Sequence, residues 1–261
     1  PALRAEKEQP MSQATYTRPA VSGNIILNSL EPDEYERLTR FFKVVDLEAQ
    51  QTLYAPGDPI AHAYFPVDSV ATAVATMNDG STVATAMIGR EGVVGIGAAI
   101  GACRARHWVR VLLPGEAMRV EAGFLRELFN DSPAWQKLLL RYYAVLISQV
   151  SRRAVCNTRH RLNERLCTWL LMLHDRVGRD DLPLTQEAAA RQLGVRRAGV
   201  NECMGYLQKL GFIVHRRGHV RLLNHEALEE AACICYQGFE RDARWHEGAE
   251  LSVGGFARSH V

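Results

Sequence analysis

The chain has 261 residues and a formal net charge of +2, with 47% hydrophobic and 23% charged residues. This composition is typical of a globular protein that buries a substantial core, and it argues against a fibrous or wholly disordered chain. No stretch has the apolar length of a membrane span, and residues 1–10 are too polar for a secretory signal. We therefore expect a cytoplasmic protein with no membrane partner, whose six cysteines stay reduced.

The charged residues are distributed unevenly along the chain. Residues 21–130 hold nine Lys and Arg against thirteen Asp and Glu, a net charge of −4, whereas residues 158–221 hold twelve against six, a net charge of +6. Such an asymmetry is expected when only one part of a protein meets phosphate. From charge alone, a basic surface that is merely solvated is an equal alternative.

The first half of the chain is predicted to form an antiparallel barrel or roll. Residues 1–21 have the composition of a disordered arm, and residues 33–43 have helical spacing. From about 44 to 120, short β-branched runs alternate with turn signals such as Asn78-Asp79-Gly80, which is typical of a hairpin. Strands are predicted at 63–65, 70–77, 82–88 and 108–113. Several short strands with no long helix between them favour a roll over residues 22–132.

A long helix is predicted from 133 to 156, within a segment assigned to 133–157. Two adjacent apolar stripes run along it, so it buries more than one face. The first stripe is Leu139, Tyr143, Leu146 and Val150, and the second is Leu138, Tyr142 and Val145. One stripe could pack on the roll and the other on a partner helix. A helix that lies wholly inside the core of a monomer is the alternative.

Residues 184–211 predict a helix-turn-helix. Thr185 is a natural N-cap for a helix from Gln186 to Leu193, and Gly194 tolerates the positive φ that a tight turn requires. A second helix is predicted from 196 to 210. Ala190 is the small residue expected where the two helices touch, and Val200 is the apolar residue expected to pack the second helix against the first. A plain corner between two helices is the alternative.

The start of the second helix carries the side chains that suit base edges. Arg pairs with guanine, Asn with adenine, and Glu accepts a hydrogen bond from cytosine. The N-terminal residues of a recognition helix are the ones that reach bases. The predicted base-reading residues are Arg196, Arg197, Asn201 and Glu202.

A basic hairpin follows the second helix and is interpreted as a wing. Residues 212–215 and 220–223 are predicted strands around Arg216-Arg217-Gly218-His219. Side chains here and at the helix ends suit phosphate, which fixes position but carries no sequence information. The predicted backbone contacts are Thr185, Gln186, Lys209, Arg216, Arg217 and His219. A further helix is predicted from 224 to 240, so the DNA-binding segment spans 158–240, and 241–261 is predicted to be a flexible tail.

This organisation resembles the CRP/FNR family of transcription regulators. The matching segments are GREGVVGIG (89–97), the apolar helix at 134–156, LTQEAAARQLGVRRAGV (184–200), LQKLGFIVHRRGHVRLL (207–223) and ALEEAACICY (227–236). The resemblance implies an α+β fold with a cyclic-nucleotide-binding-like, jelly-roll-like β-roll, a long dimerisation helix and a C-terminal winged helix-turn-helix. It also implies a homodimer on double-stranded DNA at a palindromic promoter site, where RNA polymerase is a further partner. The helix residues Leu139, Tyr143, Leu146 and Val150 are then expected at the dimer interface.

The sensor segment departs from the cyclic-nucleotide pattern of that family. The turn Gly92-Val93-Val94-Gly95 carries Val where the family has Glu, and the family's Arg falls on Ala105. Arg104 and Arg106 flank that position, so an effector pocket formed with Gly92 and Gly95 is kept as a hypothesis. A buried phosphate without its cation would be poorly held. Cyclic AMP is therefore disfavoured, and the effector, if there is one, is left open.

No cofactor or metal is predicted. The chain has no cysteine before Cys103, which disfavours an iron–sulfur cluster, whereas His62 and His107 leave haem open. The close pair Cys233 and Cys235 lacks the spacing and the second half-site of a zinc cluster. An enzyme is disfavoured because no nucleophile elbow or phosphate loop is present. A protein-binding module with a degenerate winged helix is the remaining rival.

Overall fold

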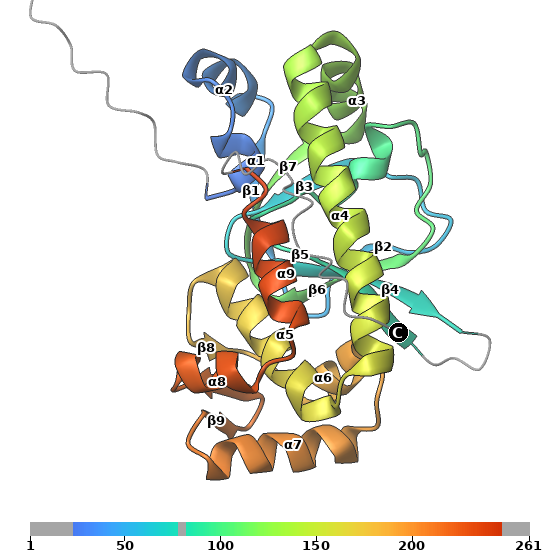
Figure 1. Cartoon of the computed structure of the whole chain (residues 1–261). Coiled ribbons are helices and arrows are strands. Elements are labelled where there is room, and N and C mark those ends of the chain that lie inside the picture. Colours follow the sequence, from blue (N-terminus) through green and yellow to red (C-terminus); the bar gives the residue numbers. More distant parts are fainter. Residues whose placement is uncertain (1–22, 78–81, 247–261) are drawn as a thin grey trace, which may run out of the picture.

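The computed structural model describes residues 23–77 and 82–246 (Figure 1). The first half of the described chain forms two antiparallel sheets, ordered β1-β7-β3 and β2-β6-β4-β5. The strands are β1 (Lys43–Leu47), β2 (Thr52–Tyr54), β3 (His62–Pro66), β4 (Val70–Thr76), β5 (Thr82–Ile88), β6 (Trp108–Leu113) and β7 (Gly115–Glu121). The predicted roll is confirmed. The predicted arm at 1–21 and the turn Asn78-Asp79-Gly80 lie outside the described residues.

Short helices close the roll. They are α1 (Ile25–Asn28), α2 (Pro32–Thr39), the 3-10 helix η1 (Ile96–Ala98) and α3 (Ala122–Asp131). The helix predicted at 33–43 ends earlier, at Thr39, because Lys43 already pairs with Arg119 of β7. Pro32 suits the first turn of α2, where its missing N–H costs no hydrogen bond.

Helix α4 (Pro133–Arg159) runs along the roll and beyond it (Figure 1). The Ser132 hydroxyl caps its start by accepting a hydrogen bond from the Trp135 N–H at 3.3 Å. Trp135, Leu139 and Tyr142 follow at helical spacing and are fully buried against the roll. Trp135 meets Phe65 of β3 edge to face, with ring centroids 6.4 Å apart.

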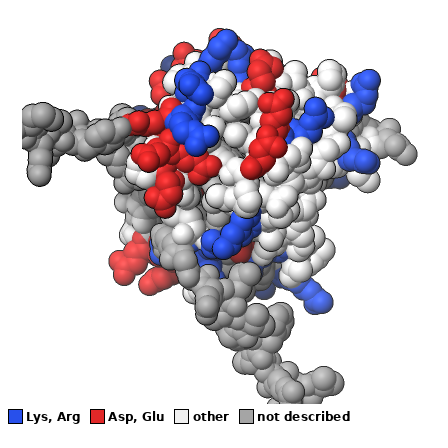
Figure 2. All heavy atoms as spheres, turned by 90° about the horizontal axis from the view of Figure 1, so that it is seen from above, with Lys and Arg blue, Asp and Glu red and all other residues white. Residues whose placement is uncertain are grey.

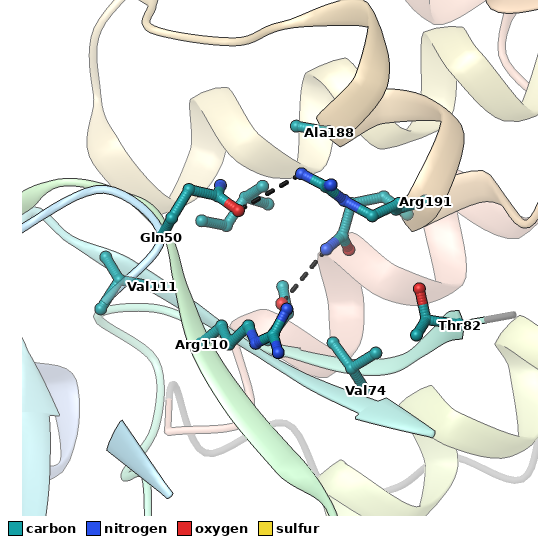
Figure 3. A pocket seen from close by; sticks show the side chains of 10 residues that line it. Gln50, Val74, Thr82, Arg110, Val111, Ala188 and Arg191 are labelled. Atoms are coloured by element: carbon teal, nitrogen blue, oxygen red, sulfur yellow. Dashed lines mark hydrogen bonds between the residues drawn. The ribbon is translucent and has the colours of Figure 1, made fainter. Parts of the chain in front are cut away.

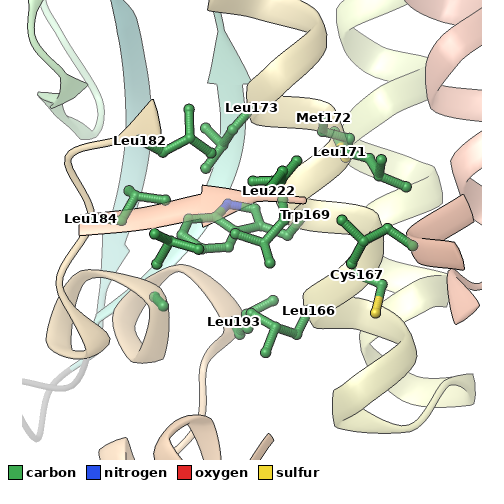
Figure 4. Close-up of a cluster of buried hydrophobic side chains, with 14 of the residues drawn as sticks. Leu166, Cys167, Trp169, Leu171, Met172, Leu173, Leu182, Leu184, Leu193 and Leu222 are labelled. Carbon is green, nitrogen blue, oxygen red and sulfur yellow. The ribbon is translucent and has the colours of Figure 1, made fainter. Parts of the chain in front are cut away.

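The second half forms a winged helix whose buried core continues into the roll, where Val70, Met87 and Leu113 belong to the same cluster. Its elements are α5 (Leu162–Val177), β8 (Asp181–Leu182), α6 (Gln186–Leu193), α7 (Arg197–Lys209), β9 (Ile213–Arg216) and β10 (His219–Leu222). The three strands pair in the order β8-β10-β9. Figure 4 shows Leu166 and Trp169 of α5 packed with Leu193 of α6 and Leu222 of β10, and all four are buried.

The last predicted helix is two helices, α8 (His225–Ala231) and α9 (Cys235–Ala243). The chain leaves the helical conformation at Ala232, whose φ and ψ are −73° and 155°. Helix α9 then packs along α4. Trp245 is buried and donates a hydrogen bond from its indole N–H to the Glu91 carbonyl at 3.1 Å. The prediction of a flexible tail from 241 therefore starts too early in the chain, because α9 continues to Ala243 and Trp245 is buried. The predicted tail beyond 246 lies outside the described residues.

The turn at Gly89–Gly92 joins the roll to both helical parts. The Glu91 carboxylate accepts a hydrogen bond from the Arg176 Nε of α5 at 2.9 Å, and both side chains are buried. Gly92 lies so close to α4 that a Cβ there would come within 2.1 Å of the Tyr142 hydroxyl. Only glycine allows this approach. The turn thus fixes α5 and α4 against the same point of the roll.

Candidate nucleic-acid interface

The helix-turn-helix is built as the sequence predicted. The Thr185 hydroxyl accepts a hydrogen bond from the Ala188 N–H at 3.0 Å and caps α6. Gly194 ends that helix in the left-handed conformation, with φ of 65°, which a Cβ would strain. Ala190 and Val200 are buried at the contact between α6 and α7. These local features set the crossing of the two helices.

The predicted base-reading residues share the outer surface of α7. Val200, Met204 and Leu207 face the core and are buried. Outside this buried stripe, Arg197, Asn201 and Glu202 are exposed to solvent, and Arg196 is exposed at the N-cap. In Figure 1, α7 forms the edge of the molecule farthest from α2 and α3.

The wing is a tight two-residue hairpin. Arg216 pairs with His219, and Arg217 and Gly218 form the turn with φ of 42° and 85°. Two consecutive positive φ values match the twist of the flanking strands in a type I′ turn. The observed turn is shorter than the predicted four-residue loop, because Arg216 and His219 belong to the strands. Both Arg216 and Arg217 are exposed.

A side-chain network joins α6, α7 and the wing. The Gln186 amide donates a hydrogen bond to the Asn201 Oδ1 at 2.7 Å and lies 2.8 Å from the His215 Nε2. The Gln208 Oε1 accepts a hydrogen bond from the His215 N–H at 2.8 Å. No sequence pattern pointed to His215 or Gln208, because their roles depend on how the wing folds back on α7.

The remaining predicted backbone contacts are spread over the same part of the molecule. Thr185 is exposed at the start of α6, and Lys209 is exposed at the far end of α7. The imidazole Nδ1 of His219 lies 3.2 Å from an Asp181 carboxylate oxygen of β8. By contrast, the end of the molecule that carries α2 and α3 shows acidic and basic side chains mixed together (Figure 2).

The exposed apolar face of α4 shares only Tyr143 with the predicted dimer stripe. Leu139 is fully buried against the roll, and Leu146 and Val150 are half-buried. Of the predicted dimer residues, Tyr143 alone is exposed, at 36%. The exposed apolar side chains on this helix are Leu140, Tyr143, Ile147 and Val155, with Ala144 and Ala154 beside them. The prediction for Leu139 is corrected: it is a core residue, because its side chain packs against the roll.

The four residues of the hypothetical effector pocket have different surroundings in the described part of the roll. Gly92 packs on Tyr142, and Gly95 lies against the Tyr54 hydroxyl. Arg104 is exposed and donates a hydrogen bond to the Gly57 carbonyl at 2.6 Å, and Arg106 is exposed beside it. The position between them, Ala105, is buried in an apolar cluster with Tyr54, Ile88 and Val94. The effector pocket at these four residues stays a prediction, and Ala105 offers no cation at the position between Arg104 and Arg106.

A pocket does occur where α6 meets the roll. Its walls include Gln50, Thr82, Arg110 and Arg191, and it holds about 30 Å³ (Figure 3). That is room for about two waters, far less than a nucleotide needs. The Gln192 amide donates a hydrogen bond to the Thr72 hydroxyl at 3.1 Å across it. The contact fixes α6 against strand β4.

Comparison with known proteins agrees with this geometry. Residues 164–231 match the sequence model of a Crp-like helix-turn-helix domain, and residues 44–132 match that of a cyclic nucleotide-binding domain. The global nitrogen regulator of Synechococcus elongatus is 20% identical over 197 residues, which cover 72% of this chain and 89% of that protein.

Two solved structures illustrate the shared fold. FixK2 from Bradyrhizobium japonicum superposes with a TM-score of 0.63 at 16% identity and covers 74% of this chain and 98% of its own. The c-di-GMP-responsive global regulator CLP of Xanthomonas campestris superposes with a TM-score of 0.60 at 18% identity and covers 74% of this chain and 100% of its own.

The roll, the long helix and the winged helix together define a DNA-binding transcription regulator. The chain belongs to the CRP/FNR family of such regulators, with a cyclic nucleotide-binding domain and a Crp-like helix-turn-helix. This is a family of regulators rather than of enzymes. Among the described residues, no helix is both long and apolar enough to cross a membrane.

Proposed function

We propose that the protein binds a palindromic duplex site as a homodimer, with Arg197 and Asn201 reading base edges in the major groove. One observation carries this proposal: both side chains are exposed on the first turns of α7, next to the basic wing. A recognition helix presents its N-terminal residues to the groove in this way. Arg196 and Glu202 flank the pair and are the secondary base-reading candidates.

Gln186 is proposed as a positioning residue rather than a phosphate contact. Its amide holds the Asn201 Oδ1 at 2.7 Å and fixes the carboxamide before DNA arrives. An ordered Asn loses less side-chain entropy when it pairs with adenine. Thr185, Lys209, Arg216, Arg217 and His219 remain the proposed phosphate contacts, and these set register without reading sequence.

The homodimer is proposed to form through the exposed face of α4. Leu140, Ile147 and Val155 are 47%, 49% and 55% exposed, and Tyr143 lies in the same stripe. Leu140, Tyr143 and Ile147 are spaced by three and four residues, as in a helix seam, and Val155 follows eight residues later. Pairing would bury apolar surface that is costly to leave in water. It would also place two α7 helices on one duplex.

The roll is proposed to be unresponsive to cyclic AMP. The position that would supply a cation for the cyclic phosphate is Ala105, which is buried among apolar side chains. The nearby Arg104 is exposed and bonded to the Gly57 carbonyl. A buried phosphate would have no charged partner here, and its desolvation would go uncompensated.

Selection from a randomised duplex pool tests the proposal. The purified chain is incubated with the pool at two salt concentrations, without ligand and then with cyclic AMP, and the retained DNA is sequenced. We expect a two-fold symmetric motif, with half-sites about one helical turn apart, that is recovered equally without cyclic AMP. A motif that needs cyclic AMP would overturn the proposal for the roll. Binding without any motif, or without salt dependence, would overturn the proposal for DNA reading.

A further inference from the structure

Four metal-ligating side chains converge where α4 ends. Cys156 and His160 are one helical turn apart at that end, and Cys233 and Cys235 lie at the junction between α8 and α9. One ligand atom from each residue lies within 4.8 Å of the other three. The three cysteines are buried and His160 is half-buried. The chain fold thus supplies the second half-site that the Cys233–Cys235 pair lacks in sequence.

The distances suit a tetrahedral metal. The Cys156 and Cys233 sulfurs are 3.5 Å apart, and the Cys235 sulfur is 3.6 Å from the His160 Nδ1. Around Zn²⁺, with sulfur at about 2.3 Å and nitrogen at about 2.0 Å, tetrahedral ligand atoms lie roughly 3.5–3.8 Å from one another. Little movement separates the present arrangement from a loaded site.

Hydrogen bonds to Thr168 hold Cys233 in place. The Thr168 hydroxyl accepts a hydrogen bond from the Cys233 N–H at 3.1 Å and lies 3.1 Å from the Cys233 sulfur. Thr168 is buried. Hydrogen bonds of this kind orient metal ligands.

Three thiolates and a neutral imidazole around Zn²⁺ carry a net charge of about −1. Arg152 and Arg153 on α4 and Arg165 on α5 belong to the helices that carry Cys156 and the Thr168 partner of Cys233. Positive charges on these helices offset part of the cost of burying that charge.

We propose that Cys156, His160, Cys233 and Cys235 bind one Zn²⁺ in a closed Cys₃His site. Four protein ligands leave no open position, which is the mark of a structural rather than a catalytic zinc. Three thiols release their protons to solvent on binding, and the imidazole donates the lone pair of Nδ1. His160 is the C-cap of α4, directly before the winged helix. The metal would therefore fasten the end of α4 to the junction between α8 and α9.

Cobalt binding tests the site without any readout from DNA. The full chain is reduced, stripped with a chelator and titrated with Co²⁺ under argon. We expect one Co²⁺ per chain, a thiolate-to-cobalt charge-transfer band in the near ultraviolet, the visible bands of tetrahedral cobalt, and displacement by Zn²⁺. Cys235→Ser and, independently, His160→Ala should lower the affinity by more than about 100-fold. Cys103→Ser is the matched control, because Cys103 is exposed on the roll.

Two results would overturn the proposal. One is the absence of these bands in the reduced, folded chain, with folding checked by circular dichroism. The other is a Cys156–Cys233 disulfide in freshly isolated protein that holds no metal. Two of the four proposed ligands would then be bonded to each other, and His160 and Cys235 alone would not form the site. Metal binding and motif selection are measured separately, so either proposal can fail alone.

Discussion

The winged helix and the roll belong to one regulator but present different surroundings at the sites where a ligand is expected. On α7 and the wing, the side chains of Arg197, Asn201 and Arg217 are exposed. In the roll, Ala105 is buried in an apolar cluster. The first arrangement suits a charged macromolecule, whereas the second offers a small anion no cation at that position. A shared family fold therefore has to be tested for ligand binding one domain at a time.

The connection between the two regions gives the largest expected effect. Arg176→Ala leaves the Glu91 carboxylate buried without its partner at 2.9 Å. We expect the free energy of unfolding to fall by about 3–5 kcal/mol, measured by urea denaturation. Arg179→Ala is the control, because its ion pair with Asp68 at 3.6 Å is partly exposed and should be worth about 0–1 kcal/mol. Equal effects of the two variants would contradict a special role for the Gly89–Gly92 turn.

Disrupting the dimer should reduce DNA binding without touching α7. Ile147→Asp places a charge in the exposed stripe of α4, where Ile147 is 49% exposed. We expect a monomer by analytical ultracentrifugation and a loss of affinity for the palindromic site of roughly 100-fold or more, because the second half-site then binds independently. Ile147→Leu keeps the stripe apolar and should stay dimeric. A dimeric Ile147→Asp would place the interface elsewhere.

A comparison within the winged helix separates base reading from phosphate contact. Arg197→Ala should cost about 1–3 kcal/mol on the selected site and relax the preference at one base pair. Arg217→Ala should weaken all sequences about equally and reduce the salt dependence by roughly one counterion. Fluorescence anisotropy over a set of single-base variants and salt concentrations measures both. Uniform weakening by Arg197→Ala would reassign that residue to the backbone.

The smallest effect concerns the positioning of Asn201. Gln186→Ala removes the hydrogen bond of 2.7 Å to the Asn201 Oδ1. We expect a loss of about 0.5–1.5 kcal/mol that is confined to the base pair read by Asn201 and absent in an Asn201→Ala background. Glu187→Ala, one residue along α6 and exposed, is the control. A loss that persists without Asn201 would make Gln186 a phosphate contact, as the sequence first predicted.

The sequence by itself determined the local elements. The Thr185 cap, the positive φ of Gly194 and the seating of Val200 are properties of neighbouring residues, so α6 and α7 could be placed within a few positions. The β-branched runs between turn signals located strands β4, β5 and β6 in the same way. Such patterns depend only on neighbouring residues, and the helices and strands that they predicted are present in the structure.

Only the tertiary structure decided which face of α4 stays exposed and which distant segments meet. Packing against the roll buries Leu139 of one predicted stripe and Tyr142 of the other, whereas Leu140, which belongs to neither stripe, is exposed. Likewise, Cys156 and Cys233 are 77 residues apart, and their sulfurs come within 3.5 Å because α8 and α9 fold back on α4. Packing between distant segments follows from the total surface that each element buries, and no window of sequence contains that information.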